Sequence, residues 1–276
     1  MNDNTLNKFN IDGQIAIITG GAGLLGIKHA EAILDGGGIP ILFDIHEESL
    51  KRALKHLSSY SKSKKFGFII DITNGTEIEM VVDKIEKEIG PISILINNAA
   101  NNPKVEKGTK NFSRLENFPI EMWEKDIAVG LTGAYLMSKI LSPRMAKRKK
   151  GSIVNIASEL GLIAPDQRLY RDEKLKDEEQ PVKPVTYSVV KHGLIGLSKY
   201  LATYWADKGV RSNAVAFGGV ENGQPADFIT KLSKLIPMGR MAKPDEYKAV
   251  VLFLCSDASS FMTGSTISID GGRTAW

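Results

Sequence analysis

The sequence predicts an α/β fold in which a parallel β-sheet is covered by helices on both faces. Short runs of apolar and β-branched residues alternate with longer helical patterns through nearly all of the 276 residues. The short runs are apolar on both faces, which is typical of strands buried inside a parallel sheet. A glycine-rich turn joins the first run to the first helical pattern, as in doubly wound sheets.

Seven strands are expected, at Gln14–Thr19, Ile39–Asp44, Lys65–Asp71, Ile92–Asn97, Ser152–Ala157, Val210–Ala216 and Thr266–Asp270. Helices are expected at about Gly26–Leu34, Ser49–Leu57, Thr76–Ile89 and Tyr187–Ala206, and a further helix ends near Lys147. The first of them stops at Gly36–Gly38, because consecutive glycines end a helix. No repeat and no second composition regime interrupts residues 1–276, so one domain is predicted.

The composition is that of an ordinary globular protein, with 42% hydrophobic and 25% charged residues. The net charge of +4 does not indicate nucleic-acid binding. The basic run Arg144–Lys150 is expected to be the solvated end of a helix, the alternative being a patch for an acidic partner. No membrane span or signal peptide is apparent. The single cysteine, Cys255, is expected to pack as a small hydrophobe in a reducing compartment, which favours the cytoplasm.

The turn after the first strand contains Gly20, Gly23 and Gly26. Glycines here let a pyrophosphate approach backbone N–H groups at a helix N-terminus. Asp44 ends the second strand 24 residues after Gly20, close to the spacing of an acidic residue that binds the adenosine ribose. A carboxylate there accepts hydrogen bonds from a 2′-hydroxyl and repels a 2′-phosphate. NAD(H) is therefore predicted over NADP(H), the alternative being that Asp44 caps a strand–helix turn.

Further motifs follow in order along nearly the whole chain. They are Asp71-Ile72, Asn97-Asn98-Ala99-Ala100, Ser158, the pair Tyr187 and Lys191 in a Tyr-x-x-x-Lys pattern, Val210–Val215, Thr263-Gly264 and Asp270-Gly271-Gly272. A Tyr-x-x-x-Lys pattern alone is common by chance. The ordered set, however, resembles the short-chain dehydrogenase/reductases, a superfamily of oxidoreductases with a single-domain Rossmann fold. Leu24 stands where the commonest version of the family's turn has glycine.

The resemblance implies an enzyme that interconverts a secondary alcohol and a ketone with a nicotinamide cofactor. It implies that Tyr187, Lys191 and Ser158 are catalytic. The cofactor-binding residues that it implies are Gly20, Gly23, Leu25, Gly26, Asp44, Asp71, Ile72, Asn98, Ala99, Tyr187, Lys191, Gly218 and Val220.

The chemistry of these residues supports the same role. Tyr187 and Lys191 are one helical turn apart, so both side chains can face one pocket. A free tyrosine, with a pKa of about 10, is a poor base at neutral pH, but a nearby ammonium stabilises the phenolate. Tyr187 can then exchange a proton with the substrate oxygen, which Ser158 would hold. The alternative interpretation is that Tyr187 and Lys191 simply lie on an exposed helix face. The neighbouring His192 is expected to have a structural role.

Besides Leu24, two residues depart from the family pattern. Gly130 stands where the family has an asparagine that helps to hold a water in the proton relay. This supports, as an alternative, a protein that binds or senses NAD(H) without turnover, although Ser158, Tyr187 and Lys191 are all retained. Phe217 stands where the family has proline, and it is expected to pack either against the nicotinamide ring or against the core.

An insertion over about 165–184 separates the catalytic residues. Ser158 and Tyr187 are 29 residues apart, more than in most relatives, so the insertion begins and ends at the mouth of the site. Its candidate substrate contacts are Arg168, Tyr170 and Arg171. A guanidinium group fits a phosphate or a carboxylate, but the charges could also balance among themselves or pack on another subunit. Ala99–Pro119 is a second long irregular stretch.

The insertion and Gly130 resemble a bacterial subgroup of the family associated with flagellin modification and sialic-acid-like sugar synthesis. This implies a small-molecule substrate that is a polyol, sugar or sugar phosphate. A 3-oxoacyl-carrier-protein reductase is the alternative enzyme, but its usual preference for NADPH conflicts with Asp44. The four histidines lack the spacing of metal ligands, so no metal is expected.

The resemblance also implies partners that are copies of the chain itself. A dimer or tetramer would form through the helix ending near Lys147, the helix Tyr187–Ala206 and Thr266–Ile269. Trp276 is expected to be buried, at a subunit contact, because an exposed terminal tryptophan is unfavourable. No nucleic acid or membrane partner is expected.

Overall fold

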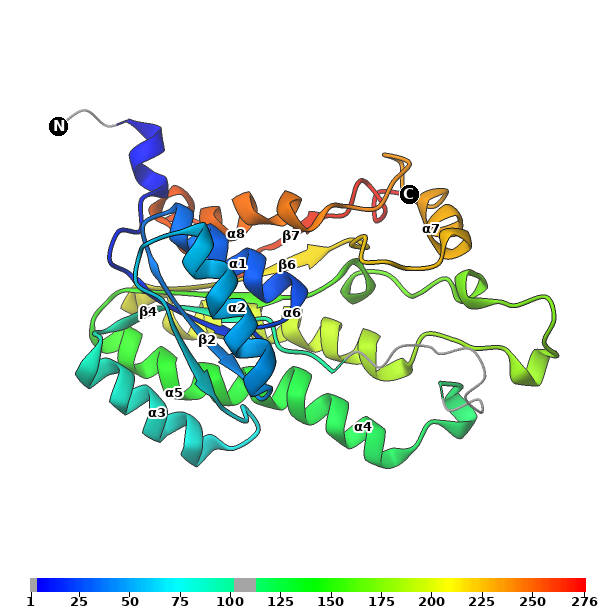
Figure 1. Cartoon of the computed structure of the whole chain (residues 1–276), viewed down its shortest axis with the longest axis horizontal. Coiled ribbons are helices and arrows are strands. Elements are labelled where there is room, and N and C mark those ends of the chain that lie inside the picture. Colours follow the sequence, from blue (N-terminus) through cyan, green and yellow to red (C-terminus); the bar gives the residue numbers. More distant parts are fainter. Residues whose placement is uncertain (1–3, 102–112) are drawn as a thin grey trace.

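The computed structural model of the chain describes residues 4–101 and 113–276, and a seven-stranded sheet lies at its centre (Figure 1). The strands are β1 (Ile15–Thr19), β2 (Ile39–Asp44), β3 (Phe66–Ile69), β4 (Ile92–Asn97), β5 (Gly151–Ile156), β6 (Val210–Phe217) and β7 (Thr266–Ile269). All seven predicted strands are confirmed, and their ends differ from the predictions by at most two residues. Most of the irregular stretch Ala99–Pro119 lies outside the described residues.

The strands are arranged in the order β3-β2-β1-β4-β5-β6-β7, and every neighbouring pair is parallel. The chain builds the sheet outward from β1 to one edge and then returns to β4 to build the other half. This is the predicted doubly wound α/β fold. The change of direction leaves a crevice at the carboxyl ends of β1 and β4, where such sheets bind their ligands.

Eight α-helices accompany the sheet in the described residues. They are α1 (Leu24–Asp35), α2 (Glu47–Tyr60), α3 (Gly75–Glu88), α4 (Ile120–Ile127), α5 (Gly133–Lys147), α6 (Val185–Trp205), α7 (Ala226–Ser233) and α8 (Lys248–Cys255). Helices α1, α2 and α8 cover one face, and α3, α5 and α6 cover the other (Figure 1). Consecutive residues of a strand point to opposite faces, so Ile17 and Ile18 of β1 belong to different apolar cores.

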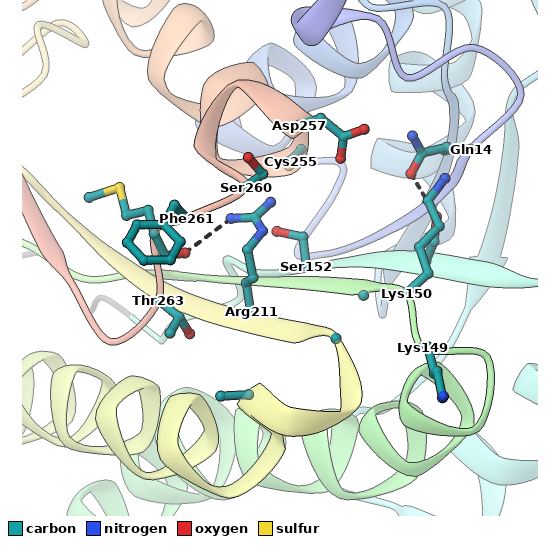
Figure 2. A pocket seen from close by; sticks show the side chains of 15 residues that line it. Gln14, Lys149, Lys150, Ser152, Arg211, Cys255, Asp257, Ser260, Phe261 and Thr263 are labelled. Atoms are coloured by element: carbon teal, nitrogen blue, oxygen red, sulfur yellow. Dashed lines mark hydrogen bonds between the residues drawn. The ribbon is translucent and has the colours of Figure 1, made fainter.

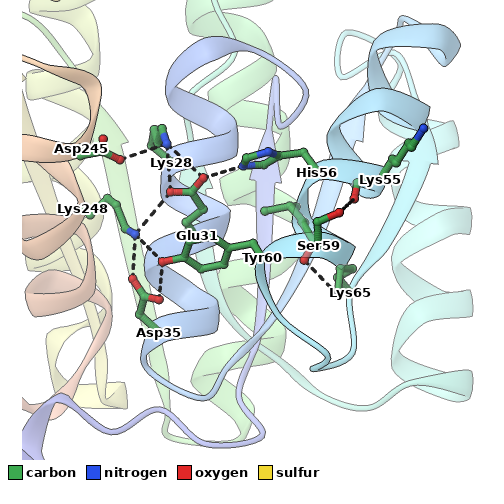
Figure 3. Close-up of polar contacts among 11 residues, drawn as sticks. Lys28, Glu31, Asp35, Lys55, His56, Ser59, Tyr60, Lys65, Asp245 and Lys248 are labelled. Atoms are coloured by element: carbon green, nitrogen blue, oxygen red, sulfur yellow. Dashed lines mark hydrogen bonds and ion pairs between the residues drawn. The ribbon is translucent and has the colours of Figure 1, made fainter.

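A cluster of charged side chains joins α1 to α2 and α8 (Figure 3). Glu31 of α1 has a side chain only 2% exposed, and it lies 3.1 Å from Lys28 Nζ, 2.8 Å from His56 Nε2 and 3.3 Å from Lys248 Nζ. Burial alone would raise the pKa of the Glu31 carboxyl, but the hydrogen bonds from His56 and Lys28 outweigh burial and lower it. The ionised carboxylate therefore holds three helices together.

The basic run Arg144–Lys150 is partly paired within the chain. Arg144 Nη1 lies 2.6 Å from Asp83 Oδ1, and Arg148 Nη1 lies 2.9 Å from Glu86 Oε1. The expectation of a solvated helix end is confirmed for Arg148 and for the lysines of the run, which are exposed. Arg144 is only partly exposed, because the acidic face of α3 packs beside the end of α5.

A cavity of about 640 Å³ lies at the amino ends of β5 and β6 (Figure 2). Arg211 in its wall donates hydrogen bonds to the backbone oxygens of Leu254, at 2.9 Å, and Met262, at 3.3 Å. Cys255 also lines it and is 3% exposed, so its packing as a small hydrophobe is confirmed. The cavity is at the opposite edge of the sheet from the crevice, and it has no part in the site described below.

The chain end differs from its prediction. Trp276 is 73% exposed in the single chain, and its Nε1 donates a hydrogen bond to Leu235 O at 3.1 Å. The prediction that Trp276 is buried is therefore wrong for the single chain, because the last residues follow the surface. A contact between Trp276 and another copy of the chain stays a prediction. Among the helices that the structure describes, none combines the length and apolarity needed to cross a bilayer.

Candidate active site

The glycine turn after β1 forms a tight cradle in which side chains would collide with the backbone. Gly20 has a φ of 60°, and a Cβ there would lie 2.9 Å from Ala99 Cα. A Cβ on Gly26 would lie 2.3 Å from Gly20 O. Gly23 caps α1 without a side-chain hydrogen bond, so no side chain occupies the first N–H groups of the helix. This cradle fits the pyrophosphate of a dinucleotide.

Asn98 and Ala99 connect the end of β4 to the same turn. Asn98 Nδ2 donates to Thr19 O at 3.0 Å and to Gly20 O at 3.1 Å. Thr19 Oγ1 accepts hydrogen bonds from the N–H groups of Asn98 and Ala99, both at 3.0 Å. Asn98 and Ala99, both predicted to bind the cofactor, therefore connect the loop after β4 to the glycine turn after β1 and fix the distance between them.

Asp44 lies against the glycine turn. Its Oδ2 accepts a hydrogen bond from Ala22 N and its Oδ1 accepts one from His46 N, both at 3.1 Å. The side chain thus caps the strand–helix turn, as the alternative interpretation held. Because each carboxylate oxygen has two lone pairs, these bonds leave acceptor capacity for a ribose hydroxyl.

The other residues expected at the adenine end are also near the crevice. Asp71 follows β3, and its Oδ1 accepts hydrogen bonds from Thr73 N at 2.9 Å and Thr73 Oγ1 at 2.7 Å. Ile72 is 7% exposed and packs in the core beside α5. Leu25 lies in the first turn of α1, packed against the core beneath the cradle.

The loop after β6 closes the crevice on its other side. Gly218 N donates to Ile269 O at 2.9 Å, and Gly218 O accepts a hydrogen bond from Tyr247 Oη at 3.0 Å. Val220 continues the loop in a parallel bridge with Ala242. Of the two alternatives for Phe217, the structure shows the core: the ring is 3% exposed and stacks on Tyr247 with centroids 3.9 Å apart.

The three predicted catalytic residues come together at the carboxyl end of β5. Ser158 lies two residues beyond the end of β5 and caps a short 3₁₀ turn, Glu159–Gly161. Tyr187 and Lys191 lie in the first two turns of α6, and Lys191 Nζ is 5.7 Å from the centroid of the Tyr187 ring. Lys191 Nζ donates a hydrogen bond to Ile156 O at 2.7 Å, which fixes the ammonium beside the end of the strand.

The electrostatics of this group differ from the expectation. Burial raises the pKa of the Tyr187 phenol, and the neighbouring Ser158 hydroxyl offsets this only in part. Burial, together with the positive charge of Lys183, lowers the pKa of Lys191 to about 8. The sequence pattern predicted a phenol made more acidic by Lys191, whereas desolvation dominates. The phenol is therefore neutral at pH 7 and is set to donate a proton.

Two charged residues beside this group were missed by the sequence analysis. Lys183 Nζ lies 3.9 Å from the centroid of the Tyr187 ring, and burial lowers the pKa of Lys183 to about 8. Glu159 is 6% exposed, and burial raises the pKa of its carboxyl to about 7. The sequence does contain a signal for Glu159, because a charged residue so close to the end of a buried strand, next to Ser158, is unusual. It contains no comparable signal for Lys183, which is one of many charged residues in the insertion.

Gly130 lies in a π-helical turn, Ala128–Thr132, between α4 and α5. Such turns are often found at functional sites. A Cβ on Gly130 would lie 2.6 Å from Val190 Cγ1. Val190 therefore fills the space that an asparagine side chain would need. His192 is exposed, and its Nδ1 is 2.9 Å from Ser188 O, in keeping with a structural role.

Because Val190 fills this space, restoring the family's asparagine should harm the protein. We expect Gly130→Asn to lower the free energy of unfolding by about 1–3 kcal/mol through overpacking, without raising turnover. Adding Val190→Ala should recover most of the stability. Gly196→Asn is the matched control, since nothing lies within 4 Å of a Cβ at that exposed helix position. Urea denaturation of the four proteins measures the effect, and an undisturbed Gly130→Asn would contradict it.

The insertion at 165–184 shows features of both of its interpretations, a loop that contacts the substrate and a surface loop whose charges balance among themselves. Arg168 Nη2 lies 2.7 Å from Asp166 Oδ2 and Arg171 Nη2 lies 2.7 Å from Asp177 Oδ1, so these charges do balance within the loop. Tyr170, in contrast, is partly buried and contacts Phe228 of α7, with the two rings tilted and their centroids 5.7 Å apart. The insertion thus packs on α7 through Tyr170 and the neighbouring Leu169.

A nucleotide cradle beside a buried serine, tyrosine and lysine defines a nicotinamide-dependent oxidoreductase. Across residues 4–101 and 113–276, no three His, Cys, Asp or Glu side chains gather to hold a metal ion. Residues 14–170 match the family model described as short chain dehydrogenase, and residues 177–274 match the model described as Enoyl-(Acyl carrier protein) reductase. The chain belongs to the short-chain dehydrogenase family. It is an oxidoreductase that uses a pyridine nucleotide to interconvert a secondary alcohol and a ketone.

Several relatives match over almost their whole length. A D-threitol dehydrogenase of Mycolicibacterium smegmatis is 31% identical over 271 residues, covering 96% of this chain and 95% of the relative. An NAD-dependent glycerol dehydrogenase of Listeria innocua is 32% identical over 271 residues, covering 96% of each chain. The crystal structure of a gluconate 5-dehydrogenase from Burkholderia cenocepacia, in complex with NADP and tartrate, is 25% identical with a TM-score of 0.85, covering 99% of this chain and 100% of that chain.

Proposed function

We propose that this chain is an NAD(H)-dependent dehydrogenase of a small polyol or sugar-like alcohol. The observation that carries the proposal is the convergence of Ser158, Tyr187 and Lys191 beside the glycine cradle, at the carboxyl end of the sheet. The relatives that act on threitol and glycerol support a small polyhydroxylated substrate. Since the gluconate 5-dehydrogenase structure contains NADP, the preference for NAD(H) depends on Asp44 of this chain.

Each catalytic side chain has one task in the proposed reaction. A bound pyridine nucleotide supplies or accepts the hydride. Ser158 holds the substrate oxygen by a hydrogen bond, and Tyr187 gives the proton to a ketone or takes it from an alcohol. Lys191, fixed by Ile156 O, provides positive charge beside the phenol and binds the nicotinamide ribose.

The remaining cofactor contacts are proposed on the same grounds. The pyrophosphate would lie on the turn Gly20–Gly26, and the adenine ring would lie between Asp71-Ile72 and the end of β2. The nicotinamide amide would meet the backbone at Gly218 and Val220. Arg168 and Arg171 stay proposed contacts for an anionic substrate group, to be tested against their pairing with Asp166 and Asp177.

We also propose that one domain over residues 1–276 assembles as a dimer or tetramer in the cytoplasm. Aromatic side chains on two helices support the assembly: Tyr135 of α5 is 48% exposed, and Tyr200 and Tyr204 of α6 are 63% and 57% exposed. Large exposed aromatic rings favour a protein–protein contact. Sedimentation equilibrium at micromolar concentration tests this.

NADH absorbance tests the proposed reaction. Glycerol, D-threitol and erythritol are assayed with NAD⁺ and with NADP⁺, and an acetoacetyl thioester is assayed with NADPH. Turnover of a polyol with NAD⁺ supports the proposal. Turnover of the thioester alone would favour the 3-oxoacyl-carrier-protein reductase alternative, which is supported by a relative of that name from Thermotoga maritima, 31% identical to this chain. NADH binding without any turnover would favour the sensor.

Asp44 should control the choice of cofactor. In Asp44→Asn the amide oxygen can still accept from Ala22 N, but the amide nitrogen cannot accept from His46 N, so one of the two turn hydrogen bonds is lost together with the charge. We expect KM for NAD⁺ to rise about tenfold and KM for NADP⁺ to fall, because the amide makes weaker hydrogen bonds to the ribose and no longer repels a phosphate. Glu47→Gln on the exposed start of α2 is the control. An unchanged ratio of the two KM values would refute the ribose role.

A further inference from the structure

Glu159 is a buried acid that the proposed reaction does not use. It follows Ser158 directly, and its side chain turns toward the ends of β6 and β7: a Cβ built on Gly218 would lie 3.1 Å from Glu159 Oε2 and 2.8 Å from Asp270 Cα. Burying a carboxyl group in this way is costly unless its oxygens are hydrogen-bonded.

The neighbouring groups do not satisfy this carboxyl. Among the described residues, Glu159 Oε2 is buried and has no hydrogen-bond partner. Asp270 is occupied by its own turn, where Oδ1 accepts from Gly272 N at 2.9 Å and Oδ2 accepts from Thr274 Oγ1 at 2.6 Å. The positive charge of Arg273 acts on Glu159, but the two form no ion pair. A buried acceptor left without a donor in this way often serves a ligand.

The surroundings place the carboxyl close to the catalytic group. Glu159 is the next residue after Ser158, and its Oε2 lies beside Gly218 at the end of β6. Burial is the main cause of the raised pKa of three phenols, Tyr170 of the insertion, Tyr187 of α6 and Tyr247 before α8, and the Glu159 charge adds to it at each. The carboxyl therefore acts on both the proton-transfer residue and the insertion.

We propose that Glu159 is a specificity-determining residue that accepts a hydrogen bond from a second hydroxyl of the substrate, next to the carbinol that reacts at Tyr187. This inference rests on the proposed function, because it gives Glu159 the task of binding the additional hydroxyl group by which a polyol differs from a simple alcohol. A hydroxyl donor satisfies Oε2 without bringing a second charge into the site. The reacting oxygen keeps Ser158 and Tyr187 as its partners.

The test compares two substrates that differ by one hydroxyl group, butane-2,3-diol and butan-2-ol, each oxidised with NAD⁺. The measured quantity is the ratio of their kcat/KM values. We expect Glu159→Leu to lower this ratio at least tenfold while kcat/KM for butan-2-ol stays within about threefold, since the lost hydrogen bond concerns only the diol. Glu88→Leu, on the exposed face of α3, is the matched control and should leave both values unchanged.

Protonation gives a second readout, which serves even if Glu159→Leu does not fold. The groups that face Glu159 are Asp270, Arg273 and the phenols of Tyr170, Tyr187 and Tyr247. Because the pKa of Glu159 is about 7, the diol preference of the parent should rise between pH 6 and pH 8 as the carboxylate forms. In Glu159→Gln the preference should be lower and independent of pH over this range.

The outcomes separate the inference from the proposed function. If neither alcohol nor any polyol is oxidised by the parent, the proposed function fails. If the parent oxidises them and the diol preference is the same in Glu159→Leu, or keeps its pH dependence in Glu159→Gln, the role of Glu159 is refuted. Equal losses on both substrates would show that Glu159 supports the fold instead, and would also refute it.

Discussion

Replacing Tyr187 with phenylalanine should lower kcat for polyol oxidation by about 10²–10⁴-fold, the range of general acid–base catalysis. The substitution removes the hydroxyl that exchanges a proton with the substrate and leaves the ring in its place. Lys191 Nζ keeps its hydrogen bond to Ile156 O, so the backbone of the site should be undisturbed. Nucleotide affinity should change by no more than about threefold, because Tyr187 loses one hydroxyl group while Lys191 and the glycine turn are unchanged.

Tyr204→Phe provides the control for this result. Tyr204 lies on the same helix, is 57% exposed and is remote from the catalytic end. It should leave kcat within about twofold, because it removes only a hydroxyl group far from the catalytic end and keeps the ring at the proposed subunit contact. NADH binding to both variants, measured by fluorescence, shows whether the fold is intact. Substantial turnover by Tyr187→Phe would mean that another group moves the proton, and Lys183 would be the next residue to examine.

The largest effect on stability should come from Glu31. We expect Glu31→Gln to lower the free energy of unfolding by about 2–3 kcal/mol, because Lys28 and Lys248 lose their buried counter-charge and keep only the more exposed carboxylates of Asp245 and Asp35. The two lysines are 22% and 19% exposed, so water relieves part of the cost. Glu48→Gln, which breaks an exposed pair with Lys51, should change the free energy by less than about 0.5 kcal/mol.

The same cluster should make stability depend on acid. The pKa of Glu31 is lowered in the folded chain from its ordinary 4.5, so the folded state holds the ionised form more strongly than the unfolded chain does. Its stabilisation is therefore complete above the unfolded-state pKa and is lost as the pH falls through the lower folded-state value. Urea denaturation between pH 3 and pH 7 should show a steeper decline for the parent than for Glu31→Gln. Parallel curves would refute the ion-pair role.

The fold could be predicted almost completely from the sequence. Strands buried on both faces appear in the sequence as short apolar runs that are easily distinguished from helices and loops. For example, β4 begins and ends at the predicted residues. The pairing of Tyr187 with Lys191 was also predictable, because helical spacing alone brings residues four apart to one face. These features depend on local geometry and on the order of elements.

The electrostatics of the site could not be predicted, because they depend on packing between distant segments. Whether Lys191 acidifies Tyr187 depends on how much water the insertion and α7 exclude, and here burial dominates. The pairing of Arg171 with Asp177 is likewise set by the path of the loop. The filling of the space beside Gly130 by Val190 requires the positions of two helices. Family resemblance identified Gly130 as a departure but could not show what replaces the asparagine.

Val190 also affects how the site exchanges hydrogen ions with the surrounding water. An apolar side chain fills the space beside Gly130 where α4 meets α5, so we expect no side chain there to hold a water for Lys191. A hydrogen ion released from an oxidised alcohol would then need another path to the solvent, and the polar insertion at 165–184 would be the first place to look for it.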